Sequence, residues 1–127
     1  MKYTIENKDK YSILKLKDDK LNELISSDLK SQIVAMNQDG VRNIILDLSD
    51  VSYCDSSGLS AILIGNKLCK KAKGSFVLVG LKVNVKRIIT ISQLDKVLSI
   101  VPSISEATDL IYMEEVEREL ANARDEE

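Results

Sequence analysis

Apolar and polar positions near the N-terminus follow the alternating pattern of β-strands. Residues 3–6 and 11–17 carry apolar side chains at near-alternate positions, which indicates strands with one solvated face. The polar residues 7–10 lie between these runs and predict a tight turn. We therefore expect a hairpin at this end of the chain.

Three later runs predict strands of a different kind. Residues 43–48 and 75–79 are apolar almost without interruption, which is typical of strands that are buried on both faces of a sheet. Residues 96–101 predict a last strand. Pro102 ends it, because proline has no N–H group to donate to a neighbouring strand.

The segments between and after these strands repeat apolar residues every three or four positions, as amphipathic helices do. The first predicted helix begins at Ser26 or Ser27 and ends just before Gly40. The second covers residues 59–73, and Gly74 closes it.

Two further helices complete the pattern. Residues 83–92 predict a short helix. Residues 103–106 (Ser-Ile-Ser-Glu) fit a capping box that opens a final helix. The residues expected to face inward on this helix are Ala107, Leu110, Ile111, Val116 and Leu120.

The elements therefore follow the order strand, strand, helix, strand, helix, strand, helix, strand, helix. Strands that alternate with helices require right-handed crossovers and parallel pairing. The predicted fold is α/β, with a mixed, mainly parallel β-sheet of four or five strands and about four helices packed against it. No apolar run approaches the ~18–20 residues of a spanning helix, so we expect no membrane insertion and a cytoplasmic location.

The composition excludes several classes of enzyme. The 127 residues suffice for one domain, and none of them is histidine. Ser-His-Asp and Cys-His nucleophilic sites therefore lack their general base, and zinc lacks its commonest ligand. The two cysteines, Cys54 and Cys69, lie 15 positions apart and fit neither a redox motif nor a metal knuckle. We interpret them as core residues and predict no metal and no cofactor.

The net charge of −2 is unevenly distributed. Residues 114–127 hold seven acidic residues and two arginines, a net charge of −5, and residues 1–113 carry +3. This balance gives no reason to expect nucleic acid as a direct partner.

We divide the chain into a domain at residues 1–112 and an acidic C-terminal helix extension or tail at residues 113–127. Four lysines of the second helix form either a solvated face or a docking patch, namely Lys67, Lys70, Lys71 and Lys73.

The densest group of small polar residues is Asp55-Ser56-Ser57-Gly58, which lies where a buried strand leads into a helix. A helix N-terminus has free N–H groups and partial positive charge, so these residue types fit a plain helix cap. The same place suits a serine that becomes phosphorylated, because the helix dipole favours the phosphate and the added charge changes a binding surface. No Gly-Lys-Ser/Thr sequence follows Gly58 and no Gly-x-Ser-x-Gly motif is present, so neither a P-loop nor a serine hydrolase is indicated.

Residues 41–59 resemble the signature of the STAS domain, in particular that of the bacterial anti-sigma-factor antagonists. The hydrophobic strand, the Asp-Val-Ser-Tyr loop and the Asp-Ser-Ser-Gly-Leu helix start match in order and spacing. Residues 85–88 and 92–94 resemble the third-helix segment of the family. The resemblance covers roughly residues 3–112.

The resemblance implies a switched binding protein rather than an enzyme. In this family the serine directly after the aspartate, here Ser56, is phosphorylated by the anti-sigma factor, which is itself a serine kinase of the GHKL type. The unphosphorylated protein binds the anti-sigma factor and frees the sigma factor, and phosphorylation releases the complex. A metal-dependent serine phosphatase resets the switch. Asp55 would cap the helix, and Ser57, Gly58 and Leu59 would line the same partner-binding surface.

Two positions depart from the family pattern. Asn22 stands where the family carries an aspartate on its kinase-facing surface, and Gln93 stands where a glycine is common. Asn22 is expected to bind the partner through hydrogen bonds without a charge. This departure favours a second interpretation, a non-switching STAS adaptor in another bacterial signalling or transport complex. A third interpretation is a small hydrolase or nucleotide-binding enzyme that uses Ser56 or Ser57.

Overall fold

A five-stranded mixed sheet forms the centre of the computed structural model, which describes residues 1–125. Its strands are β1 (Tyr3–Asn7), β2 (Ser12–Leu16), β4 (Ile44–Asp47), β6 (Phe76–Val79) and β7 (Ser99–Val101). They lie in the order β1-β2-β4-β6-β7, with β1 and β2 antiparallel and every other neighbouring pair parallel. The predicted α/β fold and its N-terminal hairpin are confirmed.

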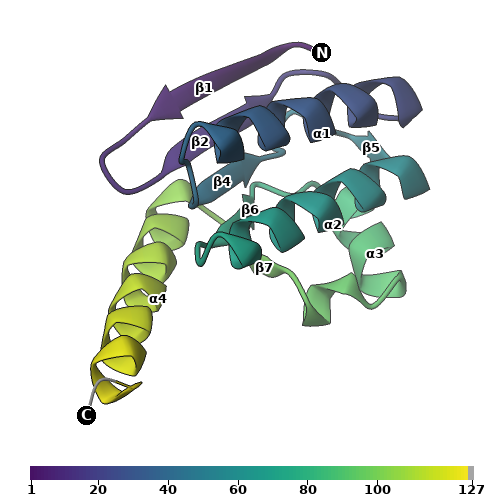
Figure 1. The fold of residues 1–127 in the computed structure, drawn as a ribbon. Coiled ribbons are helices and arrows are strands. Elements are labelled where there is room, and N and C mark those ends of the chain that lie inside the picture. Colours follow the sequence, from purple (N-terminus) through teal and green to yellow (C-terminus); the bar gives the residue numbers. More distant parts are fainter. Residues whose placement is uncertain (126–127) are drawn as a thin grey trace.

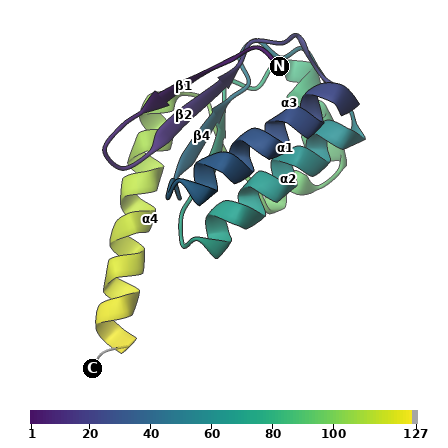
Figure 2. The same ribbon diagram turned by 45° about the horizontal axis from the view of Figure 1, so that its top comes forward.

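Four α-helices cover the two faces of this sheet. They are α1 (Glu23–Gln38), α2 (Ser56–Lys71), α3 (Val83–Ile91) and α4 (Ile104–Asp125), and a 3-10 helix, η1 (Leu94–Lys96), follows α3. α1 and α2 lie side by side over one face (Figure 1). α4 lies on the other side of the sheet, and its C-terminal part extends beyond the sheet (Figure 2). Within the described part of the chain, no helix combines the length and the apolar character needed to cross a bilayer.

Alternate residues of the central strands enter two separate cores, because successive side chains of a strand point to opposite faces. Ile44 and Leu46 of β4 join the larger cluster, which contains the buried residues of α1 and α2. Ile45 of β4 and Val77 of β6 join the smaller cluster with Ile111 of α4. β4 and β6 are therefore buried on both faces, as their uninterrupted apolar runs predict.

The helices over the larger core begin earlier than the sequence pattern predicts. α1 begins at Glu23 rather than at Ser26 or Ser27, and α2 begins at Ser56 rather than at Leu59. In each case the polar residue directly before the helix accepts a hydrogen bond from the first turn, so the helix can start there. The first turn of α2, Ser56–Gly58, adds nothing to the apolar repeat, so periodicity places that start too late. In α1 the serines at 26 and 27 resemble caps, but the cap is Asn22.

The last strand and the last helix also differ from the expectation. β7 begins at Ser99, three residues later than predicted, because the chain first forms η1. Ala107 and Ile111 of α4 are buried as predicted, but Val116 and Leu120 are 54% and 57% exposed. The prediction for these two residues was wrong because Val116, and Leu120 one turn later, lie on the exposed side of α4 with Tyr112 and Met113, not on the side that Ala107 and Ile111 turn to the sheet.

The end of α2 differs from the prediction, and the start of α4 agrees with it. After α2, the left-handed conformation belongs to Lys73, with φ of 60°, and not to Gly74. Gly74 serves a different purpose, since a Cβ atom there would collide with the backbone carbonyl of Arg42. At the start of α4 the cap by Ser103 is confirmed, because Glu106 N donates a hydrogen bond to Ser103 Oγ at 3.2 Å. The Glu106 carboxylate accepts the Ser103 hydroxyl at 3.0 Å, in place of the backbone N–H that a full capping box would use.

α4 runs without a break across the expected boundary between residues 112 and 113. The last two residues of the predicted acidic extension, 126 and 127, lie outside the described part of the chain. The division into a domain and an extension therefore stays a proposal, with the extension beginning in the middle of a helix.

Candidate functional site

A short pair of strands joins the starts of α1 and α2. The strands are β3 (Lys20–Leu21) and β5 (Tyr53–Cys54), which pair in parallel. Because Leu21 lies opposite Cys54, the residues that follow, Asn22 and Asp55, lie side by side at the N-termini of the two helices. Periodicity does not reveal this pair, since two residues are too few to show an alternation.

The two helix caps have nearly the same geometry. Asn22 has φ and ψ of −102° and −173°, and Asp55 has −99° and −173°. Asn22 Oδ1 accepts a hydrogen bond from Ile25 N at 3.2 Å, and Asp55 Oδ1 accepts one from Gly58 N at 3.0 Å. Each bond satisfies one N–H group that a helix start leaves free. Asn22 therefore caps α1 as Asp55 caps α2, with an amide in place of a carboxylate.

Gly58 lets α2 approach the end of β3 closely. A Cβ atom at this position would lie 2.8 Å from Leu21 O and 2.6 Å from Cys54 Sγ. Leu21 O cannot move away freely, because it accepts the backbone N–H of Asp55 at 3.2 Å. A larger residue at position 58 would therefore push the start of α2 away from β3 and β5.

Serine side chains line a shallow hollow between the two helix starts. Its volume is about 440 Å³. The lining residues are Glu23, Ser26, Ser27 and Lys30 from α1 and Ser56, Ser57 and Ser60 from α2. Ser56 is exposed at the first position of α2, so an enzyme could reach its hydroxyl from solvent.

Charges of both signs border this hollow. α1 and α2 run in the same direction (Figure 1), so the partial positive charges of their N-termini act on the same region. Lys30 supplies a full positive charge and Glu23 a full negative charge. A phosphoryl group on Ser56 would therefore lie near two helix N-termini and one lysine, with the carboxylates of Glu23 and Asp55 close by.

All the residues singled out for the site lie at this junction, but their exposure differs. They are Asn22, Asp55, Ser56, Ser57, Gly58 and Leu59. Ser56 is exposed, whereas Gly58 is buried and Leu59 is only 9% exposed. Glu23 and Lys30 were missed as site residues, because only the packing of α1 beside α2 brings them to Ser56.

The two cysteines belong to the core. Both thiols are free and buried. Burial raises the pKa of Cys54 to about 12, with a further contribution from the negative charge of Asp55, and burial likewise raises the pKa of Cys69 to about 12. Such thiols are protonated and unreactive near neutral pH, so their interpretation as core residues is confirmed. Among residues 1–125, no three side chains of the metal-ligating types Cys, Asp and Glu converge as a metal site requires.

A second polar cluster lies at the opposite end of the parallel strands, where β4 and β6 begin. Glu115 of α4 is buried and accepts hydrogen bonds from Arg42 at 2.8 Å, from Asn43 at 3.0 Å and from Arg118 at 3.0 Å. The bond from Asn43, aided by the two arginines, holds the pKa of Glu115 below its ordinary value, although burial acts in the opposite direction. The cluster fastens α4 to the sheet.

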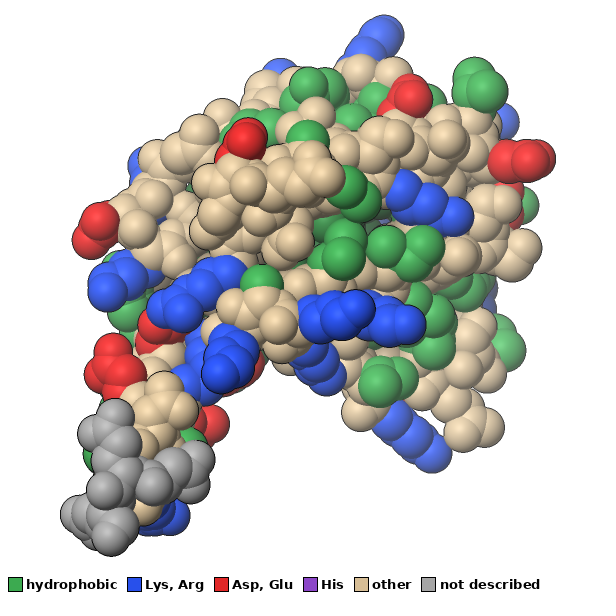
Figure 3. All heavy atoms as spheres, in the orientation of Figure 1, with side chains coloured by type: hydrophobic (Ala, Val, Ile, Leu, Met, Phe, Trp, Pro, Cys, Tyr) green, Lys and Arg blue, Asp and Glu red, His purple; other side chains and the backbone are tan. Residues whose placement is uncertain are grey.

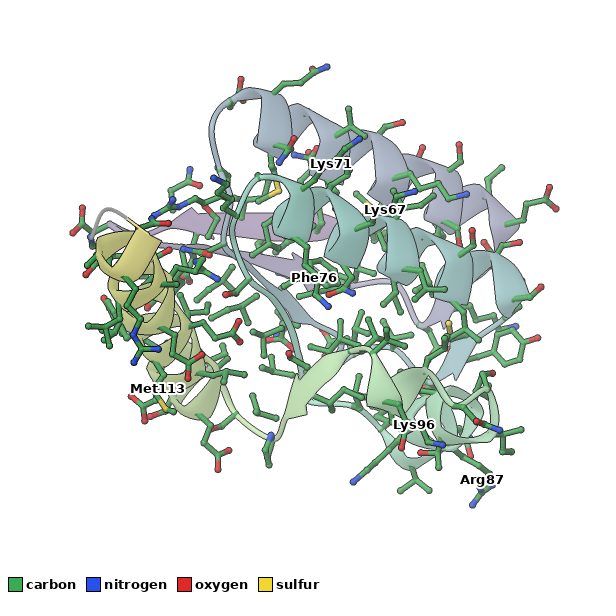
Figure 4. The ribbon with its side chains drawn as sticks, turned by 60° about the horizontal axis from the view of Figure 1, so that its bottom comes forward. Lys67, Lys71, Phe76, Arg87, Lys96 and Met113 are labelled. Atoms are coloured by element: carbon green, nitrogen blue, oxygen red, sulfur yellow. The ribbon has the colours of Figure 1, made fainter. Side chains whose placement is uncertain are left out.

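Lys67, Lys70 and Lys71 of α2, and Lys73 just after it, lie in two different surroundings. Lys70 and Lys73 border a hollow of about 490 Å³ that acidic residues of α4, including Glu114, also line. Figure 3 shows basic side chains around the C-terminal end of α2 next to acidic side chains of α4. Lys67 and Lys71 are exposed and do not line this hollow (Figure 4), which fits a solvated face. A docking role for these lysines stays a prediction.

The sequence profile of the STAS domain matches residues 5–107. This range is most of the chain and contains the whole junction of α1, α2, β3 and β5. The chain belongs to the STAS domain family. STAS proteins that resemble this one in sequence and structure are described as anti-sigma factor antagonists.

Two relatives are proposed anti-sigma factor antagonists. The one from Thermotoga maritima is 38% identical over 79 residues, which are 62% of this chain and 66% of the relative. BtrV from Bordetella bronchiseptica is 31% identical over 72 residues, which are 57% of this chain and 62% of the relative. The chain thus spans slightly less than two thirds of the length of each.

The solved structures support the same family. A crystal structure of a proposed anti-sigma factor antagonist from Thermotoga maritima has a TM-score of 0.78 and 28% sequence identity. The match covers 87% of this chain and 94% of that one. The similarity therefore extends over both layers of helices and the sheet between them, and the STAS fold is confirmed.

Proposed function

We propose that this STAS protein is an anti-sigma-factor antagonist that is switched by phosphorylation of Ser56. The observation that carries the proposal is the exposed Ser56 hydroxyl at the first position of α2, directly after the capping Asp55. The relatives described as proposed antagonists support the same class of partner. Unphosphorylated, the protein binds an anti-sigma factor, and the sigma factor is then free to direct transcription.

Phosphorylation would change the charge of the junction without unfolding it. A phosphoryl group adds nearly two negative charges. In the free protein the N-terminus of α2 and the nearby Lys30 favour these charges. In a complex the same charges would be enclosed against the partner near Glu23, and an enclosed charge without sufficient cationic partners costs several kcal/mol. Since ~1.4 kcal/mol changes an affinity tenfold, this cost is large enough to release the partner.

In this proposal the chain is the substrate of two enzymes and not an enzyme itself. The anti-sigma factor is a serine kinase of the GHKL type, which transfers the γ-phosphoryl group of ATP to Ser56 Oγ. A metal-dependent serine phosphatase hydrolyses the phosphoserine and restores the hydroxyl. Because the kinase supplies the catalytic groups, a chain without histidine can fulfil this role. We place the protein in the cytoplasm, where sigma factors act, and assign it no direct contact with nucleic acid.

The partner-binding surface in this proposal is centred on the junction of α1 and α2. Asn22 and Asp55 hold the two helix starts in position, and Ser57 lies beside Ser56 in the hollow. Gly58 and Leu59 lie underneath and keep α2 close to the paired strands. The small serine side chains allow the partner to approach both helix starts closely.

Intact mass spectrometry after incubation with the GHKL kinase and ATP tests the proposal. We expect one phosphoryl group on the wild-type protein and on Ser57→Ala, and none on Ser56→Ala. Ser57→Ala is the matched control, because it removes the same hydroxyl from the next residue of the same helix. Phosphorylation of Ser56→Ala to the wild-type extent would show that the modified residue is a different one.

Asn22 favours a second candidate function, a non-switching STAS adaptor in another signalling or transport complex. It replaces a charge that the family uses toward its kinase with a neutral amide, while it keeps the cap of α1. A pulldown with Ser56→Ala and Ser56→Glu separates the two candidates. An adaptor binds both variants equally, whereas a switch loses its partner when Ser56 is replaced by glutamate.

A further inference from the structure

Two helix faces of this protein expose apolar side chains next to charges of a single sign. The first face is on α3 and consists of Val83, Lys86, Arg87, Thr90 and Ile91. Val83 and Ile91 are 70% and 73% exposed, and Lys86 and Arg87 lie between them. We call this surface the basic face.

The second face is on α4 and carries the opposite charge. It consists of Asp109, Tyr112, Met113, Val116 and Glu117. Tyr112, Met113 and Val116 are 45%, 59% and 54% exposed. Large apolar side chains gathered in this way mark places where a protein binds another surface. We call this surface the acidic face.

The two faces match each other in length as well as in charge. In both, the residues follow the spacing i, i+3, i+4, i+7, i+8, so each set occupies one side of about two helical turns. Within residues 1–125, no ion pair joins Lys86, Arg87, Asp109 or Glu117 to another part of the chain. Figure 4 places Arg87 of α3 and Met113 of α4 on the same side of the molecule, away from α1.

We propose that the basic face of one copy of this chain packs on the acidic face of a second copy, reciprocally, in a two-fold dimer. Both faces lie on one side of the molecule, so a two-fold axis can bring each face of one copy to the opposite face of the other. The apolar side chains are then covered, and Lys86 and Arg87 meet Asp109 and Glu117 around them.

Charge argues against the simpler pairing of α4 with a second α4. Glutamates and aspartates outnumber arginines on α4, and Glu119 and Glu117 lie on either side of its apolar stripe. An α4–α4 contact would therefore bring like charges together around the apolar residues. The basic face of α3 offers the opposite sign at the same spacing, which is why we choose it as the occupant.

The proposed contacts are small, since each involves about two turns of helix on either side. Small interfaces bind weakly, and their charged rims are sensitive to salt. We therefore expect self-association that grows with protein concentration and weakens as the ionic strength rises. The inference does not depend on the phosphorylation of Ser56.

Sedimentation velocity of the full chain tests the proposal, at protein concentrations from roughly 10 µM to 1 mM, which correspond to binding free energies of only a few kcal/mol. We expect the wild-type protein to shift from monomer to dimer across this range. Asp109→Lys/Glu117→Lys and Lys86→Glu/Arg87→Glu should each weaken the dimer at least tenfold, because each places like charges across both contacts. Circular dichroism should show that both variants keep the wild-type helix content, since the substitutions are at exposed positions.

Mixing the two variants is the decisive step. In the mixed dimer one contact joins two unchanged faces. The other joins an acidic face made positive to a basic face made negative, so opposite charges meet again and dimerisation should return to the wild-type level. Lys67→Glu/Lys71→Glu, which makes the same change of charge on the exposed side of α2, is the matched control and should leave the dimer unchanged.

Three results would overturn the proposal. The first is a wild-type protein that stays monomeric over the whole concentration range. The second is a mixture of the two variants that stays monomeric. The third is stronger association of Asp109→Lys/Glu117→Lys than of the wild-type protein, which would instead indicate pairing of α4 with α4.

Discussion

Asp55, Ser56 and Gly58 show how single side chains at the start of α2 contribute in different ways. Asp55 accepts the N–H of Gly58 and so permits the helix to begin. Gly58 has no Cβ, and this allows close contact with the carbonyl of Leu21. Ser56, between them, has its side chain in solvent. Asp55 stabilises the helix start, Gly58 allows its packing, and Ser56 is left available for chemistry.

Gly58→Ala should destabilise the protein. The added methyl group would meet Leu21 O and Cys54 Sγ, and the Leu21 carbonyl is already held by Asp55 N. We expect urea unfolding to show a free energy of unfolding that is lower by about 1–3 kcal/mol. Ser60→Ala, on the exposed side of the same helix, should stay within about 0.5 kcal/mol of wild type. A fully stable Gly58→Ala protein would contradict the close packing described here.

Asp55→Ala should also destabilise α2, by about 0.5–2 kcal/mol, because the N–H of Gly58 loses its acceptor. Asp55→Asn should recover most of this loss, since an asparagine oxygen accepts the same bond at Asn22 of α1. Thermal unfolding of the two variants side by side gives the comparison. If Asn proved as destabilising as Ala, the charge of Asp55 and not its hydrogen bond would be the stabilising feature.

At the scale of elements, two sets of contacts position the long helices. They are the pairing of β3 with β5 and the hydrogen bonds around Glu115. The pairing of β3 with β5 places Asn22 next to Asp55 and so brings the starts of α1 and α2 together. At the amino end of the parallel strands, Glu115 of α4 accepts hydrogen bonds from Arg42 and Asn43 before β4. The neighbouring Glu114 accepts one from Ser75 before β6, and together these bonds fasten α4 to the sheet. Both sets of contacts join residues that are far apart in the sequence.

Glu115→Gln should lower stability in a pH-dependent way. The pKa of Glu115 in the folded protein lies below its ordinary value of 4.5, so its charge stabilises the fold above that value. This stabilisation is lost as the pH falls through the lowered pKa. We expect a difference between wild type and variant of about 1–2 kcal/mol near neutral pH, which shrinks at pH values below the ordinary pKa.

Urea unfolding at a series of pH values measures this difference. Glu119→Gln is the control, because Glu119 is exposed on the same helix and makes no ion pair within residues 1–125. A difference for Glu115→Gln that did not change with pH would show that its packing, and not its charge, fastens α4.

At the scale of the whole molecule, the proposed phosphorylation site Ser56 and the attachment of α4 lie at opposite ends of the parallel strands. Ser56 begins the helix that β4 reaches from its carboxyl end by way of β5, whereas Arg42 and Asn43, which bind Glu115, precede the amino end of β4. The sheet and the larger core lie between the two. Changes in the cluster around Glu115 should therefore leave the chemistry at Ser56 intact.

Deletion of residues 114–127 should lower stability but leave the phosphorylation of Ser56 unchanged. The deletion removes Glu115 and Arg118 and with them the cluster that fastens α4. Thermal unfolding should show a lower midpoint, and intact mass after incubation with kinase and ATP should still show one added phosphoryl group. A folded truncated protein that is no longer phosphorylated would mean that the extension takes part in the switch.

Periodicity predicted every strand of the main sheet and every α-helix, because burial on one or two faces leaves a repeat in the sequence. It misplaced the starts of α1 and α2, because caps and not apolar residues decide where a helix begins. It also missed β3 and β5, and it counted Val116 and Leu120 as buried. A repeat shows that one side of a helix is apolar but not whether anything lies against that side.

The sequence by itself determined the class of fold and the family, and it singled out Ser56 as the candidate site, since each depends on patterns and motifs that can be read along the chain. Only the tertiary structure decided what surrounds Ser56. Glu23 and Lys30 reach the hollow because α1 packs beside α2, and Asn22 meets Asp55 because β3 pairs with β5. Such neighbours come from separate parts of the chain, and only folding brings them within reach of one another.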